Sequence, residues 1–406
     1  MLADGSVDSA ASFGASGATN KNRAIAVAGD GGIFVAGVAK DIWNKKDGIV
    51  MRLTNALAKS YNSFFGEGYN DEHYDIATAG NDAFAVGEST SFAFNYSSDP
   101  KGYIVKQSNT DSNGQVGGLA KALISAQSIR SYPQGVSTDG TNPYVILHDA
   151  NYGMTIAKLN NNLSSITWAK KWGSNSAENR LMDIDTNSSG ESAAVMYEYP
   201  GLRVAKIDSS GNDTWRKSWT KATTDHGNAN PGYDLSSGRA IKLLSNGSVA
   251  LLASSMPWTT QSFKKSFYIV IFDSSGTVTV QKEFRLNNAS HYLGAVTKAL
   301  VELSDGKIVT AHSYYTGSNA AGAGWRNAVI KFDPTDTSTA INGTHGDWDI
   351  SDITDSTTSA DGASWSSHTT QLDTNMSMYF KSGYQGVANG FNVSSASVTE
   401  DTLQTL

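Results

Sequence analysis

The stretch AIAVAGDGGIFVAG, residues 24–37, sets the pattern that decides the fold. Small and apolar residues stand on both sides of Asp30-Gly31-Gly32, and a Gly/Asp cluster between two such runs is typical of a tight turn. The stretch therefore predicts a β-hairpin with its turn near residue 31.

The same hairpin recurs along the chain. Each copy has an apolar-rich strand, a turn of Gly, Asn, Asp or Ser residues, and a second strand rich in Val, Ala, Ile or aromatic residues. The further copies are IATAGNDAFAVG (76–87), GVSTDGTNPYVIL (135–147), MDIDTNSSGESAAVMY (182–197), IKLLSNGSVALLA (241–253), LVELSDGKIVTA (300–311) and, more weakly, TTQLDTNMSMYF (369–380). Their turns are about 57 residues apart on average, which is the spacing of long β-propeller blades.

A second hairpin follows each of the first six copies. The clearest examples are VMRLTNALAKSYNSFF (50–65), IAKLNNNLSSITWAKKW (156–172), VAKIDSSGNDTWRKSW (204–219) and YIVIFDSSGTVTVQKEF (268–284). Each repeat is therefore expected to hold four strands, with tight turns after the first and third strands. Longer connections follow the second and fourth strands.

The two ends of the chain complete the pattern. The seventh repeat offers a third strand, NGFNVSSASV (389–398), but no fourth, and LADGSVDSAASFG (2–14) has the look of a turn followed by a fourth strand. We therefore predict an all-β fold, a seven-bladed β-propeller of four-stranded blades whose ring is closed by the N-terminal strand. The alternative is six blades plus an irregular C-terminal segment, and residues 343–368 stay unassigned.

These repeats give a single domain over residues 1–406. Residues 1–16 are the closing strand of the last blade. The blades are expected near 17–66, 67–125, 126–173, 174–221, 222–287, 288–345 and 346–406.

The first repeat resembles bacterial and phage β-propeller repeats with the consensus L-x-x-D-G-x-x-D-x-x-F-G, followed by a strand, a D-G turn and a strand that ends in A-G. The residues that carry the resemblance are Leu2, Asp4, Gly5, Asp8, Phe13, Gly14, Asp30, Gly31, Ala36 and Gly37. Asp8 and Phe13 are five positions apart, where the consensus has three. The resemblance implies a propeller of cell surfaces, secreted proteins or virions and no particular activity.

Composition excludes several classes of function. The formal net charge is −7, so a nucleic-acid-binding surface is not expected. The chain has no cysteine, which rules out disulfides and cysteine nucleophiles. No apolar run approaches the roughly 18 residues of a membrane helix, and the N-terminus lacks the features of a signal peptide.

Candidate binding residues lie on the predicted face with the longer loops. This face gathers histidines and aromatic residues, and rigid aromatic rings suit stacking on a sugar or contact with a protein. The candidates are Trp43, His73, Phe94, Tyr96, His148, His226, Tyr233, Trp258, His291, His312, Tyr314, Trp325, Trp348 and Trp365. The alternative is that loops simply carry the residue types that these strands exclude.

No catalytic residue, metal ligand or cofactor site is predicted. The chain lacks G-x-S-x-G, H-E-x-x-H, phosphate-loop and Rossmann patterns. The turn NTDSNGQ (109–115) spaces three Asn/Asp residues like half a calcium loop, but position twelve is Ala120 and Asx turns use the same residues without metal. Acidic residues in the loops are too numerous to single out a glycosidase pair.

We therefore expect a non-enzymatic structural and recognition propeller. The first hypothesis is a virion component, such as a phage tail, baseplate or capsid-surface protein, because a chain that starts directly with a blade strand leaves no room for an export signal. Its partners would be other virion or surface proteins and a glycan, without nucleic acid or membrane insertion. The alternatives are a domain of a secreted or cell-surface glycan-binding adhesin and a polysaccharide-active propeller enzyme.

Overall fold

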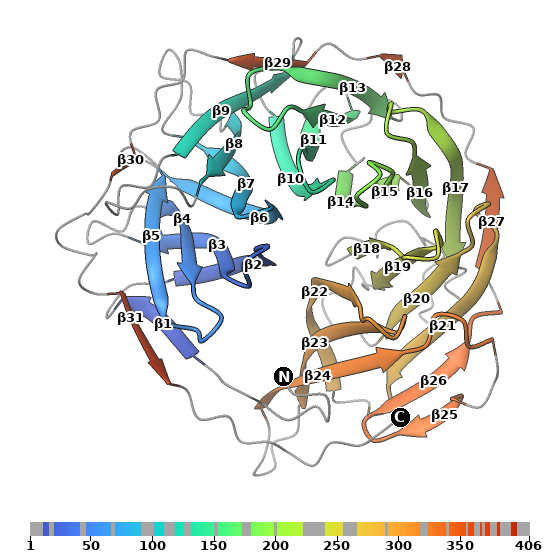
Figure 1. Ribbon diagram of the computed structural model, residues 1–406. Helices are drawn as coiled ribbons and strands as arrows, with labels where there is room; N and C mark the ends of the chain where they lie inside the picture. The colour runs from blue at the N-terminus through green and yellow to red at the C-terminus, as the bar shows by residue number, and fades with distance from the viewer. Residues whose placement is uncertain are drawn as a thin grey trace. The chain divides into compact units, whose positions relative to one another are not determined.

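The structure is a computed structural model that contains β-strands and no helix among the residues that it describes. Those residues are 11–15, 20–40, 46–65, 70–90, 101–108, 118–125, 131–149, 153–172, 180–198, 201–221, 240–254, 266–288, 291–316, 324–337, 341–354, 356–360, 366–367, 370–373, 380–381 and 391–395. The all-β prediction is confirmed (Figure 1). In this part of the chain we find no helix long and apolar enough to cross a membrane.

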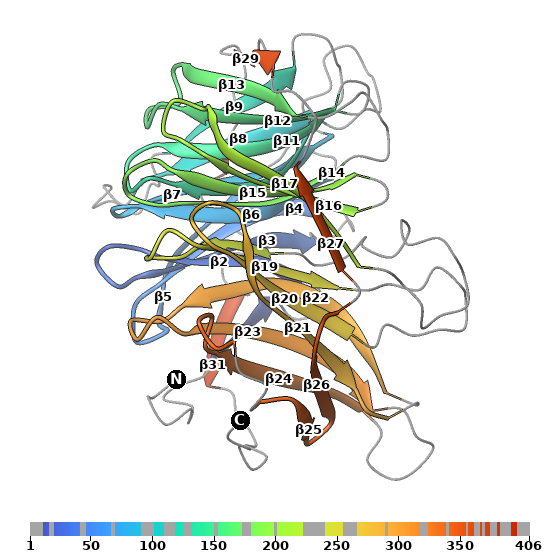
Figure 2. The same ribbon diagram turned by 90° about the vertical axis from the view of Figure 1, so that its right-hand side faces the viewer.

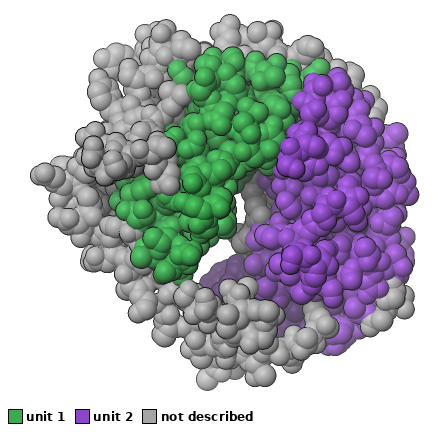
Figure 3. Space-filling view, viewed as in Figure 1, with its two compact units in different colours: residues 1–177, 366–403 green, residues 178–365, 404–406 purple. Residues whose placement is uncertain are grey.

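The chain divides into two compact units, which Figure 3 shows in different colours. Unit 1 comprises residues 1–177 and 366–403, and unit 2 comprises residues 178–365 and 404–406. Each unit contains three blades, and in each blade consecutive strands pair antiparallel with one another.

Unit 1 holds blades 1 to 3. Blade 1 is β2 (Asn20–Val27), β3 (Ile33–Lys40), β4 (Lys46–Leu53) and β5 (Lys59–Phe65). Blade 2 is β6 (Asp71–Ala79), β7 (Asp82–Ser89), β8 (Lys101–Gln107) and β9 (Gly118–Ser125), and blade 3 is β10 (Ser131–Thr138), β11 (Pro143–Asp149), β12 (Gly153–Leu159) and β13 (Ile166–Trp172).

Unit 2 holds blades 4 to 6. Blade 4 is β14 (Arg180–Thr186), β15 (Ser192–Glu198), β16 (Gly201–Ile207) and β17 (Asp213–Lys221). Blade 5 is β18 (Ala240–Leu243), β19 (Val249–Ser254), β20 (Ser266–Phe272) and β21 (Val278–Leu286). Blade 6 is β22 (His291–Glu302), β23 (Ile308–Thr316) and β24 (Gly324–Phe332), with no fourth strand among the described residues.

The chain is therefore a β-propeller of six blades, which confirms the six-blade alternative and shows that the prediction of a seventh blade is wrong. The strands expected to form that blade pair elsewhere: β29 (Thr370–Asp373) joins β9, and β30 (Phe380–Lys381) joins β5. Each of the two strands pairs with the open edge of an existing sheet. An edge strand offers unpaired N–H and C=O groups to any extended segment. A hairpin pattern in the sequence therefore cannot reveal this pairing.

The rest of the C-terminal segment follows the same rule. β26 (Trp348–Asp352) pairs with β21, β27 (Ser356–Ala360) with β17, and β28 (Ser366–Ser367) with β13. We call the strands β26 to β30 the edge segment, because each adds a strand beside the last strand of blades 5, 4, 3, 2 and 1 in turn (Figures 1 and 2). Residues 343–368, unassigned from the sequence, thus supply β25 (Gly343–His345), which pairs with β26, and the edge strands of three blades.

The predicted pairing of the two ends of the chain is confirmed. β1 (Ala11–Ala15) lies antiparallel to β31 (Phe391–Ser395), with Phe13 opposite Val393. The two strands form a sheet of their own among the described residues, because the blade that they were expected to complete does not exist.

Tight turns explain why the repeats fold as hairpins. In the turn after β16, the Gly211 N–H donates to the Asp208 carbonyl, and the Asp208 carboxylate accepts from the N–H groups of Ser210 and Asn212. Gly211 has φ +83°, a conformation that favours glycine. The same geometry recurs after β20, where Gly276 has φ +82°.

Apolar side chains fill the space between neighbouring blades of each unit. In unit 1, Phe34 and Phe65 of blade 1 pack with Tyr103 of blade 2. In unit 2, Trp215 and Trp219 of β17 pack against blade 5. Each blade is thus held to its neighbour by residues from the alternating positions of its strands.

Candidate functional site

A row of aromatic side chains crosses blade 6 near one end of its sheet. Tyr292 of β22 lies opposite Tyr315 of β23, which in turn lies opposite Trp325 of β24. The ring centroids are 5.0 Å apart between Tyr292 and Tyr315, and 5.6 Å apart between Tyr315 and Trp325. We call these three residues the aromatic row.

The aromatic row is accessible. The Trp325 side chain is 62% exposed, and the two tyrosines are half-buried. The same face of the sheet carries Val329 near its middle and Val301 at its other end, which are 51% and 55% exposed. Large exposed apolar groups that lie together are typical of a binding surface, and aromatic rings supply rigid contact area to a sugar or a protein.

The side chains of Tyr314 and His312 in β23 point to the opposite face of the sheet and are buried. The Tyr314 hydroxyl donates to Asp347 Oδ2 over 2.9 Å, and burial together with this carboxylate raises the pKa of Tyr314 to about 12. His312 stacks on Phe267 with centroids 4.0 Å apart, and burial lowers the pKa of His312 to about 4. These side chains join blade 6 to blade 5 and leave the opposite face to the aromatic row.

A charged cluster lies at the start of β6 in unit 1. The Glu72 carboxylate pairs with Arg23 over 2.7 Å and with Lys46. Burial raises the pKa of Glu72, but the hydrogen bonds and charges of the two cations outweigh it, so that the pKa is lowered overall. A carboxylate that is paired with two cations stays ionised, so it is poorly suited to act as a general acid.

His73 is fully buried beside this cluster. Its Nδ1 lies 3.1 Å from the Tyr103 hydroxyl, and its ring meets Phe65 edge-on at 5.1 Å. Burial lowers the pKa of His73 to about 3, so the imidazole is neutral. Gly48 packs against both His73 and Tyr103. A Cβ at this position would lie 2.8 Å from the Tyr103 hydroxyl, so a larger residue has no room there.

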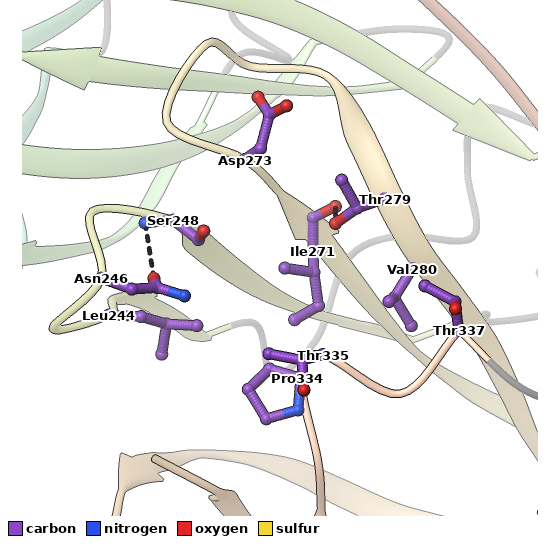
Figure 4. Close-up of a pocket in the computed structure, with 10 residues that line it drawn as sticks. All are labelled: Leu244, Asn246, Ser248, Ile271, Asp273, Thr279, Val280, Pro334, Thr335 and Thr337. Atoms are coloured by element: carbon purple, nitrogen blue, oxygen red, sulfur yellow. Dashed lines mark hydrogen bonds between the residues drawn. The ribbon is translucent and has the colours of Figure 1, made fainter.

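A small pocket opens in unit 2 on the side of the tight turns (Figure 4). It has a volume of about 240 Å³ and is bounded by the turn 244–248 of blade 5, the ends of β20 and β21, and residues 334–337 after β24. Leu244, Ile271 and Pro334 form its apolar part, with hydroxyl and amide side chains around them.

The structure describes half of the residues predicted for the binding face. His73, His312, Tyr314 and Trp348 are buried and serve packing, because each sits on a strand face that meets a neighbouring strand or blade. His148 and His291 are half-buried, and Trp325 is exposed in the aromatic row. The predictions that lie outside the described residues are Trp43, Phe94, Tyr96, His226, Tyr233, Trp258 and Trp365.

Sequence reasoning missed Tyr292 and Tyr315. Both stand next to residues that were chosen, His291 and Tyr314, and alternation along a strand places such neighbours on opposite faces. In each of these pairs, one residue lies on the face that blade 5 covers and its neighbour lies on the accessible face. Which face blade 5 covers is known only from the structure. No group of three metal-ligating side chains occurs in the described ranges, and the half calcium loop at 109–115 lies outside them.

Comparison with known proteins finds no matching family model and no matching curated protein. Among solved structures, the chain is similar to a subtype N11 neuraminidase-like protein of A/flat-faced bat/Peru/033/2010, with 11% identity, TM-score 0.41, and coverage of 77% of this chain and 86% of that one. Prolyl oligopeptidase B from Galerina marginata gives 8% identity, TM-score 0.39 and 73% coverage of this chain, which spans 38% of that protein's length. GH43 endo-arabinanase from Bacillus licheniformis gives 13% identity, TM-score 0.31, and coverage of 63% and 95%. Similarities this low assign no activity to the chain.

Proposed function

We propose that this chain is a non-enzymatic structural and recognition module of a virion, such as a phage tail, baseplate or capsid-surface protein. It works on the virion surface, contacts other virion or surface proteins and a glycan, and binds neither nucleic acid nor the membrane interior. The observation that carries the recognition role is the aromatic row, with Trp325 62% exposed beside Tyr315.

Three features support a binding role over a catalytic one. The aromatic row offers contact area and no titratable carboxylate, whereas the charged cluster at β6 ties Glu72 to two cations. His73 is fully buried and its imidazole is neutral. The virion assignment is supported by the sequence resemblance of the first repeat to bacterial and phage propeller repeats.

A gradient experiment tests the assignment. Native source material is separated into intact particles, cell envelope and medium, and the chain is quantified in each fraction by mass spectrometry. We expect cosedimentation with a capsid protein at a constant ratio. Recovery within a longer chain in envelope or medium would instead identify an adhesin domain.

A binding experiment tests the aromatic row. Trp325→Ala is expected to remove retention on the partner surface or glycan, because it deletes the most exposed ring of the row. Trp168→Ala, in β13 of unit 1, is the control for loss of a tryptophan elsewhere. Release of new reducing ends from a polysaccharide by the unaltered protein would show an enzyme instead.

A further inference from the structure

Five of the six blades share an ion pair that blade 5 lacks. The residue before the last in the third strand of a blade is Arg52 in β4, Lys106 in β8, Lys158 in β12, Lys206 in β16 and Lys331 in β24. In β20 of blade 5 the same position is Ile271.

In the other five blades this cation meets an acidic residue of the first hairpin. The pairs are Arg52 with Asp30, Lys106 with Asp82 at 2.9 Å, Lys158 with Asp139 at 3.0 Å, Lys206 with Glu191 at 3.6 Å and Lys331 with Asp305 at 2.8 Å. Blade 5 has lost both partners, because its turn reads LSNGS where blade 6 reads LSDGK, with Asn246 in the place of Asp305.

In blades 2 and 4 the long cationic side chain also reaches the next blade. The Lys206 ammonium donates to the Gly247 carbonyl of blade 5 over 3.2 Å, and Lys106 donates to Asn161 of blade 3. Ile271 is too short to do this. The pocket of about 240 Å³ lies at this position, with Ile271 and Asn246 in its lining.

The pocket is lined by groups that suit hydroxyl-rich ligands. Within the described part of the chain, Ser248 Oγ, Thr337 Oγ1 and Asn246 Nδ2 have no protein hydrogen-bond partner, while Asn246 Oδ1 accepts from the Ser248 N–H. Among the described residues no Lys or Arg lines the pocket, which disfavours an anion. Asp273 at its edge is held ionised by its own turn, whose hydrogen bonds lower its pKa.

We propose that this pocket in blade 5 binds one neutral sugar residue. The C–H face of the ring packs on Leu244, Ile271 and Pro334, and its hydroxyls exchange hydrogen bonds with Ser248 and Asn246 (Figure 4). The volume is below the roughly 300–1,000 Å³ of sites for drug-sized ligands, so it matches a single sugar ring. This site is separate from the aromatic row and does not depend on its role.

The test restores the ion pair of the other blades. Ile271→Lys with Asn246→Asp recreates a pair that five blades tolerate, so the protein should fold while the lysine fills the pocket. Ile271→Val is the matched control that leaves the pocket open. Saturation-transfer NMR is measured with glucose, galactose, mannose and N-acetylglucosamine, and thermal midpoints confirm folding.

We expect saturation transfer from the unaltered protein and from Ile271→Val to at least one of the four sugars, and no transfer from the double variant. If the double variant folds poorly, Ser248→Ala replaces it in the test. This variant removes a hydroxyl from the pocket without filling space, and we expect it to weaken the transfer. Absence of transfer from the unaltered protein to any of the four sugars, or equal transfer from a folded double variant, would overturn the proposal. Each comparison is made in the Trp325→Ala background, which removes sugar binding by the aromatic row, so that the remaining transfer reports the pocket alone.

Discussion

Gly48 shows how a single residue without a side chain fixes the buried surroundings of His73. A Cβ at this position would lie 2.8 Å from the Tyr103 hydroxyl and 3.0 Å from His73 Nε2, both of which are fully buried. Gly48→Ala is therefore expected to lower the free energy of unfolding by about 1–3 kcal/mol through overpacking, measured by urea titration. Gly324→Ala is the control, since no atom lies within 4 Å of its Cβ. Equal stabilities for the two variants would mean that the space around Gly48 is looser than described.

At the scale of single elements, the edge segment is the feature with the clearest consequence. Thr357 and Thr358 of β27 lie opposite Thr220 and Trp219 of β17. Replacing both threonines by proline removes the backbone N–H groups of residues 357 and 358. Each hydrogen bond to β17 that is lost in this way lowers the stability of the pairing by roughly 1 kcal/mol. The amides of residues 213–221 should then exchange faster with deuterium.

Replacing both threonines by valine is the matched control, because valine keeps the N–H groups and suits a strand. Hydrogen exchange of residues 213–221 should match that of the unaltered protein in this variant. If proline and valine variants exchange alike, β27 does not protect β17 in solution.

The elements also show how far the sequence could predict the fold. Gly-centred turns such as the one at Gly211 announce each hairpin, so the strands of the first six blades fall within the predicted blade ranges. The edge segment was not predictable, because β28 and β30 are two residues long and carry no hairpin signal. Pairing at an open edge depends on backbone groups that any residue type provides.

The candidate sites were predictable to a smaller extent. Trp325 was chosen because it lies near a long loop, yet its partner Tyr315 was passed over for the buried Tyr314. A loop position predicts proximity to a face, whereas exposure depends on which side the next blade covers. The pocket of blade 5 did have a sequence signal, Ile271 in the place of a lysine, which becomes visible only when the third strands are aligned.

At the scale of the whole molecule, each compact unit contains one deeply buried histidine with a lowered pKa. These are His73 in unit 1, with a pKa of about 3, and His312 in unit 2, with a pKa of about 4, against an ordinary value of 6.5. The unfolded chain binds protons at these histidines below about pH 6.5, and the folded chain does not. Their stabilising contribution is therefore complete above pH 6.5 and is lost progressively as the pH falls toward the folded-state pKa values.

We expect the free energy of unfolding to fall between pH 7.5 and pH 5.0 by roughly 2 kcal/mol for each histidine, since one pKa unit corresponds to about 1.4 kcal/mol. The two cations beside Glu72 lower the pKa of its carboxyl group, so Glu72 stays ionised over this range. Urea titrations of the double variant His73→Phe, His312→Phe should show a smaller difference between the two pH values, because phenylalanine fills the same apolar surroundings without binding a proton. An unchanged pH dependence in the phenylalanine variant would show that other groups govern the acid sensitivity of both units.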